Sequence, residues 1–149
     1  MRKIIINALF ASASAFVFLF PFIASAEITN NFALYERNFL YAFLFTQIVE
    51  ISVVFILIKR IYKHEEINVS KIIFVGFIAS ALTLPYLWFI LPFYIFNKTI
   101  YVIIGESLVI LIESIIYNQL LNIKPSESFK ISLAANVSSF LFGLFLYLN

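Results

Sequence analysis

Four long apolar runs follow one another along this chain, and they constrain its fold more than any other feature. They cover about residues 38–58, 72–96, 99–121 and 131–148. Each is close to the roughly 20 apolar residues that a helix needs to cross a bilayer. Inside hydrocarbon a segment has to pair its own backbone groups, and the alternation typical of barrel strands is missing from all four runs. The sequence therefore predicts an all-α fold, a polytopic membrane helical bundle with four transmembrane helices.

The composition agrees with a membrane protein and excludes several other classes of protein and kinds of site. Hydrophobic residues make up 63% of the 149 residues and charged residues only 12%, well outside the usage of soluble proteins. The chain has no cysteine, so a disulfide, a thiolate nucleophile and a cysteine-based metal site are excluded. The net charge of +2 is too small to indicate nucleic-acid binding. The sequence also lacks a phosphate-binding loop, a nucleophile elbow and a His/Cys cluster, so we expect neither a metal nor a cofactor.

The first 26 residues have the pattern of a cleavable signal peptide. A basic start with Arg2 and Lys3 leads into an apolar stretch, Pro21 interrupts it, and residues 24–26 read Ala-Ser-Ala. The same apolar stretch comes close to the length of a membrane span. We therefore expect residues 1–26 to be either a signal peptide or a first transmembrane helix, which would bring the number of spans to five. Residues 27–149 then form a single membrane domain.

The basic residues predict the orientation of the chain, because Lys and Arg collect on the cytoplasmic side of a membrane. Eight of the ten fall on one side: Arg2, Lys3, Lys59, Arg60, Lys63, Lys71, Lys124 and Lys130. This distribution places loops 59–71 and 122–130 in the cytoplasm and the C-terminus outside. Tyr62 and Tyr117 are expected at the inner boundary, where aromatic side chains collect. We therefore expect a protein integral to the cytoplasmic (plasma) membrane, with the lipid bilayer as its surroundings.

The connections between the runs predict two antiparallel hairpins. Short loops favour antiparallel neighbours, so the first run is expected to pair with the second and the third with the fourth. The two hairpins resemble each other, with Glu50 matching Glu106 in one alignment and Glu113 in another. One sequence does not decide between these registers, nor between a true parallel repeat and a chance similarity of apolar helices.

Three glutamates interrupt the apolar runs. Glu106 and Glu113 are one heptad apart, so they share a helix face about 10 Å apart along the axis, and Glu50 lies in the first run. An acidic side chain at the centre of a membrane helix costs on the order of 2.5 to 3.5 kcal/mol, so we expect these side chains to face the bundle interior. No Lys or Arg lies at matching depth. We therefore expect neutral, protonated carboxyls, which both donate and accept hydrogen bonds.

Stripes of small and polar residues mark the helices that face these glutamates. The second run carries Gly76, Ser80 and Thr83, and the fourth carries Ser132, Asn136, Ser139 and Gly143. Such stripes let membrane helices approach closely, so Gly76, Ser132 and Gly143 are predicted packing positions. At about 1.5 Å per residue, Glu50 lies level with Ser80 and Thr83, and Glu113 lies level with Asn136 and Ser139. Each carboxyl is therefore expected to hydrogen-bond across its own hairpin, while Glu106 lies nearest the outer side, where water can reach it.

Two further stretches have simpler interpretations. The segment TLPYLWFILPFY, 83–94, contains Pro85 and Pro92, which each remove a backbone donor. We expect a kinked helix in which some carbonyls lack a backbone donor, and we expect the Thr83 hydroxyl to donate to one of them. His64, in KRIYKHEEINVSK, is expected in a solvated cytoplasmic loop, because no metal-binding spacing surrounds it.

Functions of different kinds fit a polar bundle interior. The glutamates with Asn136 can form a site that transports or senses a proton, a cation or a small solute, since ionisable groups inside membranes are functional candidates. Alternatively they are helix-packing contacts of a non-catalytic accessory or assembly subunit that docks through the stripe at Gly143. A lipid-directed enzyme is least favoured, because the outer side lacks basic residues to hold a headgroup. Four short helices enclose little volume, so we expect a homo-oligomer or a membrane partner.

Overall fold

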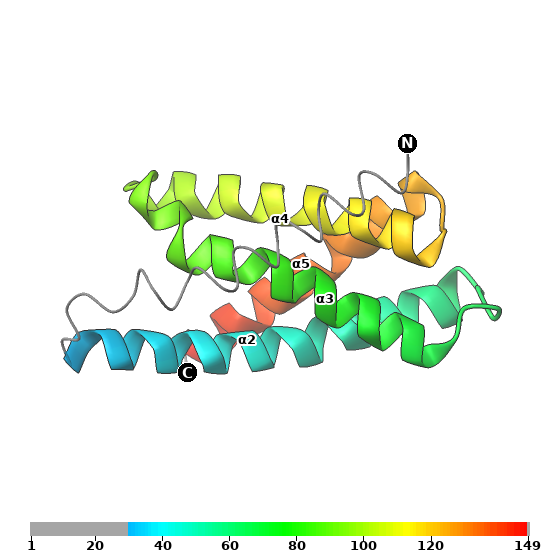
Figure 1. Ribbon diagram of the computed structural model, residues 1–149, viewed down its shortest axis with the longest axis horizontal. Coiled ribbons are helices and arrows are strands. Elements are labelled where there is room, and N and C mark those ends of the chain that lie inside the picture. Colours follow the sequence, from blue (N-terminus) through cyan, green and yellow to red (C-terminus); the bar gives the residue numbers. More distant parts are fainter. Residues whose placement is uncertain (1–29, 149) are drawn as a thin grey trace. The chain divides into compact units, whose positions relative to one another are not determined.

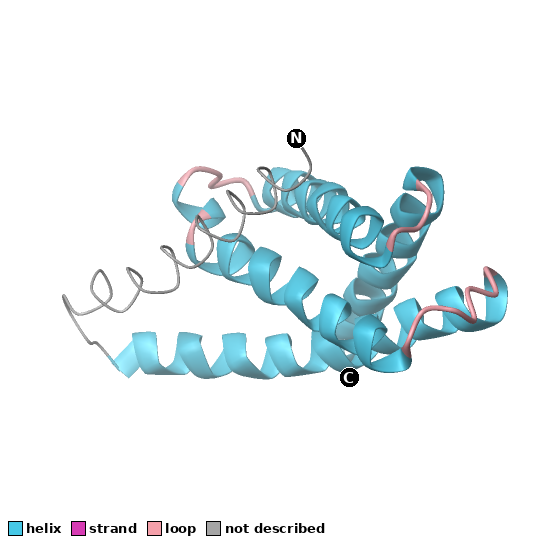
Figure 2. Ribbon diagram, turned by 45° about the vertical axis from the view of Figure 1, so that its right-hand side comes forward, coloured by secondary structure: helices cyan, strands magenta, loops and turns pink. Residues whose placement is uncertain are grey.

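A computed structural model describes the backbone of residues 30–148 and the side chains of residues 35–144. The helices are α2 (Asn30–Ile56), α3 (Val69–Phe89), α4 (Lys98–Leu121) and α5 (Pro125–Leu148), with a π-helical turn at Leu57–Ile61 and a 3-10 turn at Leu91–Phe93 (Figure 1). Helices joined by short loops make up the whole described part of the chain, without a strand (Figure 2). The expected all-α fold is therefore confirmed for these residues. The segment 1–26 lies outside them.

Three of these helical segments are long and apolar enough to cross a membrane. They are Tyr35–Ile61, Val69–Phe93 and Lys98–Leu121. They coincide with the first three runs of the sequence, although the second ends a few residues before the expected boundary at 96. The fourth run lies within α5, which is not among the three, so its crossing of a membrane stays a prediction. The arrangement of the spans as two hairpins across a bilayer also stays a prediction.

Asparagines set the ends of the helices. The Asn68 side chain accepts the Ser70 amide at 2.9 Å and so caps the start of α3. Asn97 caps α4 in the same way. Asn122 ends α4 with a left-handed backbone, φ 57°, which asparagine tolerates better than most residues. Since Pro125 begins α5 only a few residues later, α4 and α5 are joined by a tight connection.

The chain divides at Asn38 into two units, and the second, Phe39–Asn149, holds the packed part of the bundle. Within it, α4 lies against both α3 and α5. The Phe39 ring of α2 meets the Phe89 ring of α3 with centroids 4.8 Å apart. Further along α2, Ile51 packs beside Gly76 near the other end of α3. These contacts show that α2 and α3 run antiparallel in this unit.

The apolar core lies toward one end of the bundle. Its buried residues are Val54, Ile58, Ile67, Ile72, Val75, Ala79, Tyr117, Leu121, Ile123, Ile131 and Ala135. They lie on the side of Glu50 and Glu113 that leads to the loops at 62–68 and 122–124, and Ile67 and Ile123 belong to those loops. Because close-packed side chains leave little room for water, this core separates the centre of the bundle from those two loops. We call this end of the bundle the loop end.

The two prolines act differently from each other. Helix α3 continues through Pro85 and ends at Phe89, and Pro92 lies in the 3-10 turn that follows. A backbone carbonyl near the end of α3 receives a donor from the next helix. The donor is the Tyr101 hydroxyl, which lies 2.7 Å from the Leu87 carbonyl oxygen. This bond ties α4 to the end of α3.

The three predicted packing positions have different surroundings. At Gly76 a Cβ atom would lie 3.1 Å from the Ile51 side chain, and Ser132 donates to the Ile110 carbonyl at 3.0 Å, so both positions hold helices close together. A Cβ atom at Gly143 would meet no atom within 4 Å. The sequence did not single out Gly105, where a Cβ atom would overlap the side chain of Leu87.

This contrast predicts that Gly76→Leu destabilises the fold and that Gly143→Leu does not. A leucine at 76 has to displace Ile51 and the helix that carries it, and overpacking of this kind costs about 1 to 3 kcal/mol. Thermal unfolding of the purified protein in detergent micelles measures the difference. Equal stability of the two variants would contradict the close contact between α2 and α3.

Candidate functional site

Glu50 lies at the centre of the bundle and links three helices. Its side chain is buried on α2, with 2% of the residue exposed. One carboxyl oxygen is 2.6 Å from the Ser80 hydroxyl on α3, and the other is 2.9 Å from the Ser139 hydroxyl on α5. Both oxygens of a carboxyl that cannot reach water therefore have hydroxyl partners.

Glu113 makes the corresponding links from α4. It is completely buried, and its Oε1 lies 3.1 Å from the Thr83 hydroxyl on α3. Its Oε2 lies 2.6 Å from the Asn136 amide nitrogen and 3.4 Å from the Ser132 hydroxyl, both on α5. Each of the two carboxyls thus bridges α3 and α5, one from each of the remaining helices.

Part of the pairing expected from depth alone is wrong. Glu50 meets Ser80 and Glu113 meets Asn136, as predicted. Thr83, however, contacts Glu113 and not Glu50. Ser139 contacts Glu50 and not Glu113. Each carboxyl therefore has at least one hydrogen-bond partner in its own expected hairpin and another in the other hairpin.

Helix geometry explains this exchange of partners. Residues three apart in an α-helix are separated by about 60° around its axis, so they point toward different neighbours. On α3, Ser80 faces α2 while Thr83 faces α4. On α5, Asn136 faces α4 while Ser139 faces α2. The four helices therefore enclose one polar interior, which the position of a residue along the membrane normal does not reveal.

The hydroxyls of this interior each have at least two possible acceptors but only one hydrogen. The Thr83 Oγ1 is 3.1 Å from Glu113 and also 3.1 Å from the Ala79 carbonyl. Neither acceptor is a carbonyl freed by a proline, so the prediction that Thr83 satisfies such a carbonyl is wrong. The Ser139 Oγ is 2.9 Å from Glu50 and 3.0 Å from the carbonyl three residues earlier. A neutral carboxyl can donate to such a hydroxyl, which then donates to the backbone, whereas a carboxylate can accept from it. The same positions therefore satisfy both protonation states.

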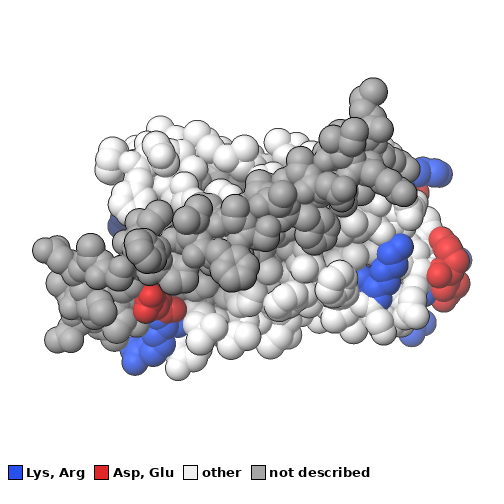
Figure 3. All heavy atoms as spheres, viewed as in Figure 1, with Lys and Arg blue, Asp and Glu red and all other residues white. Residues whose placement is uncertain are grey.

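Positive charge lies away from this interior in the part of the chain that the structure describes. The ion pairs there involve Lys59, His64 and Lys124, which belong to the two loops at the loop end. In the view of Figure 3, charged side chains lie over that end, and the visible described surface along the middle of the helices carries none. Glu50 and Glu113 are thus held by neutral hydrogen-bond donors alone.

Glu106 is not joined to the two central carboxyls by hydrogen bonds. It lies on α4 two turns before Glu113, is only half-buried, and is close enough to Glu50 for the two side chains to interact electrostatically. No hydrogen bond links its carboxyl to another residue in the described segments. Its place in a shared functional site stays a prediction.

Two buried polar residues next to the carboxyls were not assigned from the sequence. Gln47, one turn before Glu50, donates to the Phe77 carbonyl at 3.4 Å, while its Oε1 has no partner among the described residues. Tyr117, one turn after Glu113, is fully buried, and its hydroxyl has no partner there either. Tyr117 thus packs inside the bundle, because its spacing of four from Glu113 turns it inward, and its depth at the inner membrane boundary stays a prediction. That spacing was the available signal.

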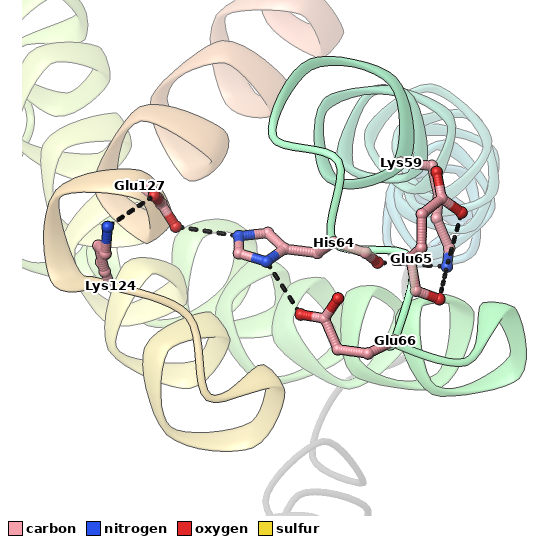
Figure 4. Close-up of polar contacts among 6 residues, drawn as sticks. All are labelled: Lys59, His64, Glu65, Glu66, Lys124 and Glu127. Carbon is pink, nitrogen blue, oxygen red and sulfur yellow. Dashed lines mark hydrogen bonds and ion pairs between the residues drawn. The ribbon is translucent and has the colours of Figure 1, made fainter.

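His64 joins the two loops at the loop end instead of lying free in water (Figure 4). Its Nε2 is 3.0 Å from Glu127 in the first turn of α5, and its Nδ1 is 3.1 Å from Glu66 in its own loop. Only an imidazolium donates from both nitrogens. The pKa of Glu66 is lowered from its ordinary value, first by a hydrogen bond from its own backbone amide and further by His64. Lys124 lies 3.9 Å from the other oxygen of Glu127.

Comparison with models of protein families, with curated proteins and with solved structures finds no match to this chain. Among the described residues, no group of three or more His, Cys, Asp or Glu side chains is arranged to hold a metal ion.

The contacts of Glu113 predict opposite outcomes for two substitutions. Glu113→Ala leaves the buried Asn136 amide without its 2.6 Å partner and should lower the free energy of unfolding by about 1 to 3 kcal/mol. Glu113→Gln retains a donor and an acceptor in the same shape, as a neutral carboxyl does, and should change it by less than about 1 kcal/mol. Thermal unfolding in detergent measures both, with Glu106→Ala as the control outside the network. Destabilisation by glutamine as large as by alanine would contradict a neutral carboxyl.

The contacts of His64 predict a link between the loops that depends on Glu127. The imidazole Nε2 lies 3.0 Å from Glu127 in the first turn of α5, whereas the other partner, Glu66, belongs to the same loop as His64. Amide hydrogen exchange of residues 62–67 should therefore be faster in Glu127→Ala than in the wild type at the same pH. The exposed Glu65→Ala should leave the exchange unchanged. Equal exchange in Glu127→Ala and the wild type would contradict the link.

Proposed function

We propose that this chain is an integral protein of the cytoplasmic membrane that transports or senses protons through Glu50 and Glu113. The observation that carries the proposal is that two buried carboxyls, without an opposing positive charge among the described residues, are held by hydroxyls that suit both their neutral and their ionised forms. Reversible protonation at a fixed position is the basic requirement of a proton site. In this proposal all four predicted spans cross the membrane, with loops 59–71 and 122–130 in the cytoplasm and the C-terminus outside.

The burial pattern supports access from one side. The apolar core separates the two carboxyls from the loop end. Toward the other end of α4, Glu106 is half-buried and interacts electrostatically with Glu50. A proton that arrives from that end can therefore meet Glu106 before the central pair. Full transport then requires the core at the loop end to open, whereas sensing requires only that the protonation state alter the packing of the four helices.

Proton flux in proteoliposomes tests this proposal. With a pH-sensitive dye inside the vesicles and a potassium diffusion potential, the wild type should acidify the lumen. Glu113→Gln and Glu50→Gln should reduce the flux to the level of empty vesicles, because an amide holds the site together but does not bind or release a proton. Glu65→Gln, a change of the same kind in an exposed loop, serves as the control. Unchanged flux in both central variants, or none in the wild type, counts against transport.

A second function is favoured by the surroundings of Gly143. Apolar residues on either side of this glycine are exposed, and nothing in the described chain packs against its Cα face. A small residue in this position suits close approach of another helix, from a second copy or from a different membrane protein. In this alternative the chain is an accessory or assembly subunit and the glutamates are packing contacts.

Co-purification distinguishes the two functions. A stoichiometric partner that is lost in Gly143→Leu, while the variant stays folded, would favour the assembly role. A monodisperse single chain with proton flux would exclude it.

A further inference from the structure

The Tyr117 hydroxyl is a buried group for which the proton site gives no role. Tyr117 is completely buried, and its hydroxyl has no hydrogen-bond partner among the described residues. It lies one turn after Glu113 on the same face of α4, and long side chains in a helix point back toward the preceding turn. The hydroxyl is therefore directed toward the layer that contains Glu113, and the two groups interact electrostatically.

An unpaired hydroxyl in this position carries a cost. Leaving a buried polar group unsatisfied costs about 1 to 3 kcal/mol, and buried tyrosines usually find a partner. Phenylalanine would fill the same volume without that cost. A ligand that binds between the tyrosine and Glu113 would recover it.

The oxygen atoms around Glu113 are suited to a cation. Besides the Glu113 carboxyl and the Tyr117 hydroxyl, the layer contains the hydroxyls of Thr83 and Ser132. Those two hydroxyls have backbone acceptors of their own, the Ala79 carbonyl at 3.1 Å and the Ile110 carbonyl at 3.0 Å. When their hydrogens turn to these carbonyls, the oxygen lone pairs are free to face a positive ion. Oxygen-only ligands with a single negative charge match a hard monovalent cation.

We infer that Glu113, Thr83, Ser132 and Tyr117 bind a monovalent cation of the size of Na⁺ in exchange for the proton of Glu113. The inference rests on the proposed function, whose proton site it shares, and it adds the cation as a second substrate. As the cation binds, the O–H bond of Glu113 breaks, and the proton leaves for water on the side away from the loop end. The neutral acid is replaced by a carboxylate–cation pair, so the net charge of the buried site does not change. This avoids the cost of leaving an uncompensated charge in the bundle.

Competition between the cation and a carboxyl reagent tests the exchange. Dicyclohexylcarbodiimide reacts with protonated carboxyls in apolar surroundings, and mass spectrometry of the digested full chain locates the modified residue. At pH 6, labelling of Glu113 should slow at least tenfold when NaCl replaces choline chloride at equal ionic strength. Tyr117→Phe should be labelled like the wild type but need at least tenfold more Na⁺ for the same protection. Tyr62→Phe, in the loop, should behave like the wild type.

The outcomes separate this inference from the proposed function. If Na⁺ does not protect while labelling and proton flux persist, the cation is excluded and the proton site stands. Protection by Ca²⁺ or Mg²⁺ but not by Na⁺ would overturn the inferred ligand. Equal protection by Na⁺ in Tyr117→Phe and the wild type would overturn the role of the tyrosine. If the reagent does not reach Glu113 at all, retention of radioactive Na⁺ by the wild type and its loss in Tyr117→Phe decide the question. Na⁺ binding without proton flux would support the cation site and count against proton transport.

Discussion

Removing a carboxyl group from water is the constraint on which the rest of this structure depends. A glutamate inside an apolar bundle is tolerated only if both of its oxygens find partners. One neighbouring helix does not supply enough of them here, so Glu50 and Glu113 each draw on α3 and α5 together. The need to satisfy two carboxyls therefore holds all four helices around one interior, and it makes the helix pairs interdependent.

The two ends of the bundle are built differently. At the loop end, branched aliphatic side chains and Tyr117 form a compact core that excludes water from the centre. At the other end, α3 stops at Phe89, Pro92 prevents it from continuing, and the α4 helix is held by one hydroxyl bond and by close packing at Gly105. A half-buried carboxyl, Glu106, lies on this second side. The bundle is thus closed by apolar packing on one side and carries a half-buried carboxyl on the other.

The chemistry of the centre follows from hydroxyls that have a choice of acceptor. A Ser or Thr in a helix can donate to a carbonyl of the preceding turn or to a side chain on a neighbouring helix. Thr83 and Ser139 each have both acceptors within hydrogen-bond distance, and Ser132 has two acceptors on α4, the Ile110 carbonyl and the Glu113 carboxyl. In the proposed exchange, a small rotation of a hydrogen replaces a movement of the helix, so the bundle stays intact when a proton or a cation enters or leaves. The Asn136 amide, which has two hydrogens, holds Glu113 in place throughout.

The sequence by itself determined the helical class, the positions of the long helices and the inward orientation of the central glutamates, because apolar length and the cost of burying charge are local properties of the chain. It also indicated the partners Ser80 and Asn136, which follow from depth along a helix. Only the tertiary structure decided that Thr83 contacts Glu113 and that Ser139 contacts Glu50. These contacts depend on the rotation of each helix about its axis and on which helices are neighbours. Those quantities are set by the packing of the whole bundle, and an apolar sequence with nearly uniform helix faces does not specify them.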